Sequence, residues 1–148
     1  MFEMNDIKVS DAMNKKPISV KTGIYVSECA KLMRENDIGS LLVEENGILM
    51  GFITEQGIVH KVVARGKDPK VVRVEDIMLR NVLTVTPQME LYEAMKLMTR
   101  REIRQLPVID NGHIVGLITR NDVLQIQPTL IELLAERFRT MRNYTEYE

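Results

Sequence analysis

Hydrophobic and polar positions along this chain follow two periodicities, one typical of strands and one typical of helices. Three short apolar runs in the second half, residues 82–85, 106–109 and 114–118, have the length and composition of strands. Between the first two, apolar residues recur every three or four positions over residues 89–101, which predicts an amphipathic helix. These residues are Leu91, Ala94, Met95 and Met98.

Turn and capping residues separate these elements. Asn111 and Gly112 lie between the last two apolar runs and predict a hairpin, because both residue types tolerate positive φ. Thr119 or Asn121 can cap a helix that follows. The first half shows the same order: a strand at 18–20, a helix at 26–35, strands at 41–44 and 49–53 around Asn46-Gly47, and a helix ending near residue 65 with Gly66 as its C-cap.

The two halves are copies of one another. An offset of 65 residues places residues 9–59 on residues 74–124 without a gap, and 16 of the 51 aligned pairs are identical. A gapless duplication indicates two copies of one supersecondary unit. Because each copy is small, we expect the two to share a core and to hold any ligand in the cleft between them. Function is expected where the copies differ.

The pattern predicts an α/β (α+β) fold of two β-α-β-β-α repeats with an added C-terminal helix. The expected divisions are residues 1–66 for the N-terminal segment and first repeat, 67–73 for a linker, 74–126 for the second repeat, and 127–148 for the C-terminal helix and tail. The C-terminal helix carries a broad apolar stripe that would either cap the core or form a dimer interface. It comprises Leu130, Ile131, Leu133, Leu134, Ala135, Phe138 and Met141, after Pro128 in the first turn.

Composition narrows the class of protein. The 148 residues are 45% hydrophobic, and 20 basic residues balance 21 acidic ones, which is typical of a soluble globular protein without a general nucleic-acid surface. Apolar runs are too short to span a bilayer, and the first residues lack a signal-peptide core. A single cysteine fits a reducing compartment. We therefore expect a cytoplasmic protein with no membrane association.

The sequence contains few candidate catalytic or metal-binding residues. His60 and His113 have no cysteine or acid at metal-ligand spacing, and Cys29 lies on an apolar helical stripe where a small core residue is expected. Neither a Gly-rich phosphate loop nor a nucleophile elbow is present. We predict a protein that is not an enzyme and that requires no metal and no cofactor.

A basic segment lies between the repeats. Residues 60–73 carry five Lys or Arg residues and one acid, Asp68. Either the segment is a solvated helix end with its linker, since cations are favoured near a helix C-terminus, or it binds an anionic partner.

Motifs in both repeats carry a family resemblance. Val9-Ser10-Asp11-Ala12-Met13 and Val74-Glu75-Asp76-Ile77-Met78 open the two repeats. In the second repeat, Leu83-Thr84-Val85-Thr86-Pro87, Ile103-Arg104-Gln105-Leu106-Pro107-Val108 and Gly116-Leu117-Ile118-Thr119-Arg120-Asn121-Asp122-Val123 follow at the spacing of the family. Over about residues 9–125 the chain resembles a tandem pair of cystathionine β-synthase (CBS) domains, or Bateman module. Such modules are regulatory sensors that bind adenine nucleotides or S-adenosylmethionine-type ligands in two clefts related by pseudo-twofold symmetry.

The resemblance implies a main cleft around Asp122. One carboxylate can accept hydrogen bonds from both ribose hydroxyls, although an acid in Thr-x-x-Asp can equally be a helix cap. Arg104 and Arg120 would hold phosphates with Ser40 and Thr119. The family pattern also brings in Pro17, Ile18, Ser19, Ile38, Gly39 and Asn121.

The second cleft departs from the pattern. The position equivalent to Asp122 is Gly57, so the ribose would lack its carboxylate. We expect this cleft to be empty, weak, or selective for something other than a nucleoside. Its implied residues are Thr54, Gln56, Val82, Leu83, Ile103, Arg104 and Gln105.

These observations predict a non-enzymatic sensor that binds an adenosine-containing ligand, with AMP as the first candidate and ADP, ATP or S-adenosylmethionine as others. The ligand would be regulatory, the working unit a homodimer, and the regulated partner an unidentified protein. The alternative is a dimerising interaction module with no physiological nucleotide. A small nucleic-acid regulator that uses the basic segment is a weaker third reading.

Overall fold

The computed structural model describes residues 7–124, 135–137 and 139. The chain divides into two compact units. Unit 1 takes its described residues from 1–16, 84–110 and 115–148, and unit 2 consists of residues 17–83 and 111–114. The predicted mixed α+β fold is confirmed, with small sheets and short helices in both units.

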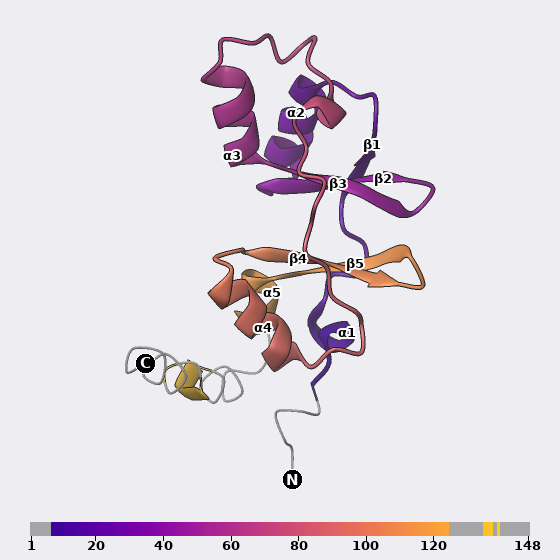
Figure 1. Ribbon diagram of the computed structural model, residues 1–148, viewed down its shortest axis with the longest axis vertical. Helices are drawn as coiled ribbons and strands as arrows, with labels where there is room; N and C mark the ends of the chain where they lie inside the picture. Colours follow the sequence, from indigo (N-terminus) through magenta and orange to yellow (C-terminus); the bar gives the residue numbers. More distant parts are fainter. Residues whose placement is uncertain (1–6, 125–134, 138, 140–148) are drawn as a thin grey trace. The chain divides into compact units, whose positions relative to one another are not determined.

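Unit 2 is a three-stranded sheet with helices on one face (Figure 1). Strand β1 is parallel to β2, which is antiparallel to β3, in the order β1-β2-β3. The elements are β1 (Ser19–Lys21), α2 (Val26–Asn36), β2 (Ser40–Glu45), β3 (Ile48–Thr54), α3 (Glu55–Ile58), the π-helical turn η2 (Val59–Val63) and the 3-10 turn η3 (Val74–Asp76).

Unit 1 is built around the hairpin of β4 and β5, with α4 and α5 on one side of it (Figure 1). Its described elements are α1 (Val9–Ala12), α4 (Leu91–Arg100), β4 (Gln105–Asp110), β5 (His113–Thr119) and α5 (Arg120–Leu124). The tip of the hairpin, residues 111–114, clusters with unit 2.

The predicted turns are confirmed. Both hairpins turn through an Asn-Gly pair at positive φ, 52° and 81° for Asn46 and Gly47 and 50° and 79° for Asn111 and Gly112. Gly66 also has positive φ, 66°, where the C-cap was predicted. The two repeats thus adopt the same local conformations at these aligned turns.

The predicted strand at residues 82–85 is wrong. Its residues form only an isolated parallel bridge between Val85 and Val108, so unit 1 keeps a two-stranded sheet. In the first repeat, the Leu42 N–H donates to the Ile18 carbonyl at 3.4 Å and extends the pairing of β1 with β2. The aligned residue in the second repeat is Pro107, which has no N–H to donate.

The segment at the start of each repeat pairs with the other repeat. We define the leading segments as residues 7–14 and 72–79. In unit 1, the Val9 N–H donates to the Met89 carbonyl and the Leu91 N–H to the Ile7 carbonyl, both at 2.9 Å. The matching pairs in unit 2 are Val74 with Ile24 and Val26 with Val72, again at 2.9 Å. Residues from the start of one repeat therefore hold the helix start of the other.

The same exchange continues along each leading segment. Asn14 forms an antiparallel bridge to Leu117, and Leu79 forms one to Phe52. Beside these bridges the Met13 side chain covers Gly116 and the Met78 side chain covers Gly51. The absence of a side chain at each glycine permits this close approach.

Two buried apolar clusters result, one in each unit. Ile7 and Val9 of the first repeat pack with second-repeat residues such as Leu91 and Leu106. Val72 and Ile77, which precede the second repeat or belong to it, lie in the cluster of unit 2. The predicted division at residues 66, 73 and 126 therefore does not coincide with the compact units, because the leading segments cross over.

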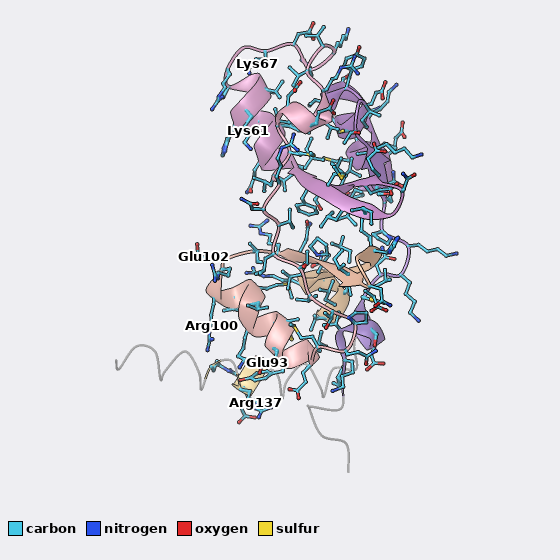
Figure 2. All side chains as sticks on the ribbon, turned by 45° about the vertical axis from the view of Figure 1, so that its right-hand side comes forward. Lys61, Lys67, Glu93, Arg100, Glu102 and Arg137 are labelled. Atoms are coloured by element: carbon cyan, nitrogen blue, oxygen red, sulfur yellow. The ribbon has the colours of Figure 1, made fainter. Side chains whose placement is uncertain are left out.

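The apolar stripe of the C-terminal segment lies outside the described residues, except for Ala135. Ala135–Arg137 is helical, and the guanidinium of Arg137 lies over the ring of Tyr92 at 4.6 Å from its centroid. Figure 2 shows Arg137 at the end of α4 that carries Glu93. This contact joins the C-terminal helical residues to unit 1.

Candidate ligand-binding site

In unit 1, Thr119 and Asp122 form reciprocal hydrogen bonds at the start of α5. The Thr119 N–H donates to Oδ2 of Asp122 at 2.9 Å, and the Asp122 N–H donates to Oγ1 of Thr119 at 3.1 Å. Both side chains are half-buried. Of the two predicted caps, Thr119 is therefore the one used, and the helix-capping role of Asp122 is observed.

Capping uses only part of the hydrogen-bonding capacity of the Asp122 carboxylate. An ionised carboxylate offers about four acceptor positions on two oxygens, and the Thr119 N–H occupies one of them. The cap instead holds the side chain in one orientation, so that a ligand donor meets a charged acceptor that is already in place. A pair of vicinal hydroxyls fits the acceptors that remain.

Two arginines lie next to this cap. The N–H of Arg120, the first residue of α5, donates to the carbonyl of Arg104 at 3.2 Å, immediately before β4. Both side chains are exposed. A guanidinium presents several N–H donors in a plane and keeps its charge at neutral pH, so this pair can receive an anionic group beside Asp122.

Unit 2 repeats the backbone but not the side chains. Oγ1 of Thr54 accepts the Gly57 N–H at 3.0 Å, which caps α3, yet Gly57 has no carboxylate to return the bond. The N–H of Glu55 donates to the Gly39 carbonyl at 3.0 Å, as Arg120 does to Arg104. The carboxylate of Glu55 lies against Gly39, where its Oε1 would be 2.5 Å from an added Cβ.

The predicted site residues are divided between the units. Unit 1 brings together Ile103, Arg104, Gln105, Thr119, Arg120, Asn121 and Asp122. Unit 2 contains Pro17, Ile18, Ser19, Ile38, Gly39, Ser40, Thr54, Gln56, Val82 and Leu83. Within unit 2, buried Ser40 faces Thr54 across the β2–β3 pair. The assembly of residues from both units into one cleft stays a prediction.

Glu55 is not among the residues predicted for either cleft. Its position against Gly39 was not predicted. The signal was present in the alignment of the repeats, because Gly39 and Glu55 align with Arg104 and Arg120. Two cationic positions in one repeat thus correspond to a glycine and an acid in the other.

Several basic residues near the junction of the repeats bind backbone carbonyls. Nζ of Lys61 donates to Ile77 at 3.0 Å, Arg73 to Gly23 at 2.7 Å, and Arg80 to Glu75 at 3.0 Å. Arg73 also stacks over Tyr25. These contacts favour the structural reading of the basic segment. Figure 2 labels Lys61 on the helical stretch of unit 2 and Lys67 beyond its end.

The remaining candidates show no catalytic grouping. In the described part of the chain, no three His, Cys, Asp or Glu side chains gather in a way that could hold a metal ion. Burial, with a smaller contribution from the charge of Glu28, raises the pKa of Cys29 to about 11. A thiol in that environment is protonated at neutral pH and is a poor nucleophile.

Among the helices of the described residues, none has the length and apolar character to cross a membrane.

Two segments match one family model, that of the CBS domain, over residues 9–64 and 74–128. The chain belongs to the CBS domain family. The two matches cover the duplicated region, and they confirm the tandem CBS arrangement that the motifs predicted. Gly57 and Asp122 are therefore aligned positions of two CBS repeats.

Relatives and solved structures agree with this assignment. An uncharacterized protein of Methanopyrus kandleri is 38% identical over 138 residues, which cover 92% of this chain and 70% of that protein. The crystal structure of a conserved protein from Pyrococcus horikoshii has a TM-score of 0.77 and 32% identity, covering 86% of this chain and 96% of the other. The CBS domain pair of protein MJ0100, in complex with 5′-methylthioadenosine and S-adenosyl-L-methionine, has a TM-score of 0.71 and 30% identity, covering 80% and 94%.

Proposed function

We propose that this CBS pair is a non-enzymatic regulatory module that binds an adenosine-containing ligand, with AMP as the first candidate, at Asp122. The observation that carries the proposal is the arrangement in unit 1, where the capped carboxylate of Asp122 lies beside the backbone-paired Arg104 and Arg120. The adenosine-type ligands of the similar MJ0100 pair support the ligand class. No metal or cofactor is required for this role.

Each part of the ligand has a matching chemical group. The Asp122 carboxylate would accept hydrogen bonds from the two ribose hydroxyls, and a charged acceptor strengthens both. The guanidinium groups of Arg104 and Arg120 would meet the 5′ phosphate. Apolar residues of the other repeat, Ile18 and Ile38, would flank the adenine, as the family resemblance implies.

Regulation would act by population shift. A ligand that contacts both repeats favours the arrangement of the two units that it binds best, and a partner protein that recognises this arrangement then binds more or less tightly. The effect is limited by the difference in the ligand's affinity for the two arrangements.

The proposal includes a homodimer as the working unit. Val59 and Val63 lie one turn apart on the helical stretch after β3 and are 50% and 63% exposed. Covering such side chains with a second copy would remove apolar surface from water. We expect light scattering at micromolar protein concentration to give twice the chain mass. A monomer with and without AMP would contradict this part of the proposal.

The test compares Asp122→Ala with Asp122→Asn by calorimetric titration of AMP and adenosine. Both variants should weaken both ligands, by about 1.5–3 kcal/mol for the alanine, because the ribose is common to the two compounds. Asparagine retains an acceptor for the Thr119 N–H and should keep the stability of the wild type, whereas alanine loses the cap and about 1 kcal/mol.

The outcome separates a binding role from a capping role. If Asp122→Asn leaves the affinity for both ligands unchanged, Asp122 is only a helix cap. If no adenosine compound binds or stabilises the wild type, the module is better explained as a dimerising interaction domain without a nucleotide.

A further inference from the structure

The two repeats present different charges at one and the same backbone arrangement. In each repeat, the first residue of the helix after the hairpin donates its N–H to the residue that precedes the hairpin. The bond is 3.2 Å from Arg120 to Arg104 in unit 1 and 3.0 Å from Glu55 to Gly39 in unit 2. We call the first pair the arginine edge and the second the glutamate edge.

At the glutamate edge, the Glu55 side chain lies against Gly39. Oε1 of Glu55 would lie 2.5 Å, and its carboxyl carbon 3.3 Å, from a Cβ added to Gly39. The carboxylate thus occupies the space in which a side chain at position 39 would begin. In unit 1 the same backbone position carries Arg104, so an arginine side chain begins where the first repeat has a carboxylate.

Neither edge is neutralised from within the described residues. Glu55, Arg104 and Arg120 are exposed, and no ion pair to any of them is formed in that part of the chain. The arginine edge therefore carries two positive charges and the glutamate edge one negative charge, a difference of three charges between the two edges. The Asp122 carboxylate beside the arginine edge, aligned with Gly57, reduces the difference between the two sites to two charges.

We infer that the two edges select adenosine ligands of opposite charge. The arginine edge takes a ligand with an anionic 5′ group, whereas the glutamate edge rejects that ligand and takes one whose 5′ group is cationic. The inference rests on the proposed function, because it assigns ligand classes to the two repeats of the same module.

The size of the selection follows from Coulomb's law. A unit charge a few ångströms from another in water changes an equilibrium constant by about fivefold. A 5′ phosphate carries about 1.5 to 2 negative charges at neutral pH. Solvent exposure and salt reduce the effect, so removal of the Glu55 charge should improve phosphate binding at its edge by about tenfold. The same removal should weaken a singly charged cationic ligand by about fivefold.

A site-resolved titration tests the inference. Backbone amide shifts of Gly57 and Asp122 report the two edges separately in NMR spectra of the full chain. Each is followed with AMP, adenosine and 5′-amino-5′-deoxyadenosine, which share the nucleoside and differ in the charge of the 5′ group. The proteins are the wild type, Glu55→Gln, Glu55→Arg and Glu28→Gln, the last being a matched loss of one exposed carboxylate elsewhere in unit 2.

At the Gly57 amide, the wild type should bind the amino compound best and AMP worst. Glu55→Gln should tighten AMP by about tenfold, and Glu55→Arg, which copies the residue of the second repeat, should reverse the order. Glu28→Gln should behave as the wild type. At the Asp122 amide the order should be the opposite, and no Glu55 substitution should alter it.

Other results overturn the inference and distinguish it from the proposed function. If AMP shifts the Asp122 amide but none of the three compounds shifts Gly57, or if Glu55→Gln changes the ratio of amino compound to AMP less than twofold, the charge selection is wrong and the adenosine site in unit 1 stands. If no compound shifts either amide, the proposed function fails and the inference fails with it.

Discussion

Replacing Gly51 with alanine should destabilise the protein through a contact between the two repeats' sequences. A Cβ at position 51 would lie 2.6 Å from Sδ of Met78 and 2.8 Å from the carbonyl oxygen of Leu79. The methionine side chain can move aside. The carbonyl is held, because it accepts the Phe52 N–H at 2.9 Å while the Leu79 N–H returns a bond of 2.8 Å to Phe52.

The expected loss can be worked from these contacts. An added methyl group in a closely packed place costs about 1–3 kcal/mol. Relief of the clash by moving Leu79 would weaken a hydrogen bond with a net contribution of about 1 kcal/mol. Gly51→Ala should therefore lower the free energy of unfolding by about 2–4 kcal/mol. For a chain of this size, that corresponds to a fall of about 6–12 °C in Tm.

Urea denaturation followed by circular dichroism measures the effect, with a lower midpoint and an unchanged slope expected. Gly116→Ala should behave alike, since its Cβ would meet Met13 Sδ at 2.6 Å and the Asn14 carbonyl at 2.9 Å. Gly57→Ala is the control: its Cβ meets only Thr54 Oγ1, at 3.3 Å, and alanine favours a helix by about 1 kcal/mol. A loss below about 0.5 kcal/mol for Gly51→Ala would refute the reasoning, because it would show that the leading segment does not pack as described.

Two further predictions concern the candidate binding sites, and two concern Cys29. Gly57→Asp should complete the reciprocal cap with Thr54 and raise stability by about 1 kcal/mol in thermal denaturation; unchanged stability would contradict the capping argument. The added carboxylate should also tighten adenosine binding in unit 2, as measured by calorimetry. Arg104→Ala should weaken AMP far more than adenosine in parallel titrations, and equal losses would remove Arg104 from the phosphate role. The raised pKa of Cys29 predicts slow reaction with a thiol reagent at pH 8 unless the protein is denatured, and rapid native labelling would contradict it. Because the folded thiol keeps its proton longer, its contribution to stability is complete below pH 9, the ordinary value, and falls as the pH rises toward about 11, which denaturation midpoints across that range would show.

Local sequence determined most of the elements and many of their ends. The Asn-Gly pairs placed both hairpin turns because their backbone needs positive φ at adjacent residues. Periodic apolar residues predicted α2 and α4 to within a residue or two, since each helix buries one face. The gapless duplication also located the candidate site, because Asp122 and Gly57 occupy aligned positions.

Only the tertiary structure shows which residues pair with others far away in the chain. Residues 82–85 have strand propensity, yet the N–H that would extend their pairing is absent at Pro107, a residue more than twenty positions away. The position of the Glu55 carboxylate against Gly39 likewise depends on how β3 and α3 lie beside the start of β2. Periodicity describes one element at a time and does not report which residues meet between elements.

The exchange of the leading segments was decided by the tertiary structure alone. Residues 7–14 and 72–79 carry aligned apolar residues, among them Val9 and Val74, and the identical Met13 and Met78. Either segment offers nearly the same side chains to either hairpin, so local propensity and apolar pattern cannot distinguish self-pairing from exchange. The exchanged arrangement is fixed by the backbone bridges between Asn14 and Leu117 and between Leu79 and Phe52. These contacts depend on the path of the whole chain.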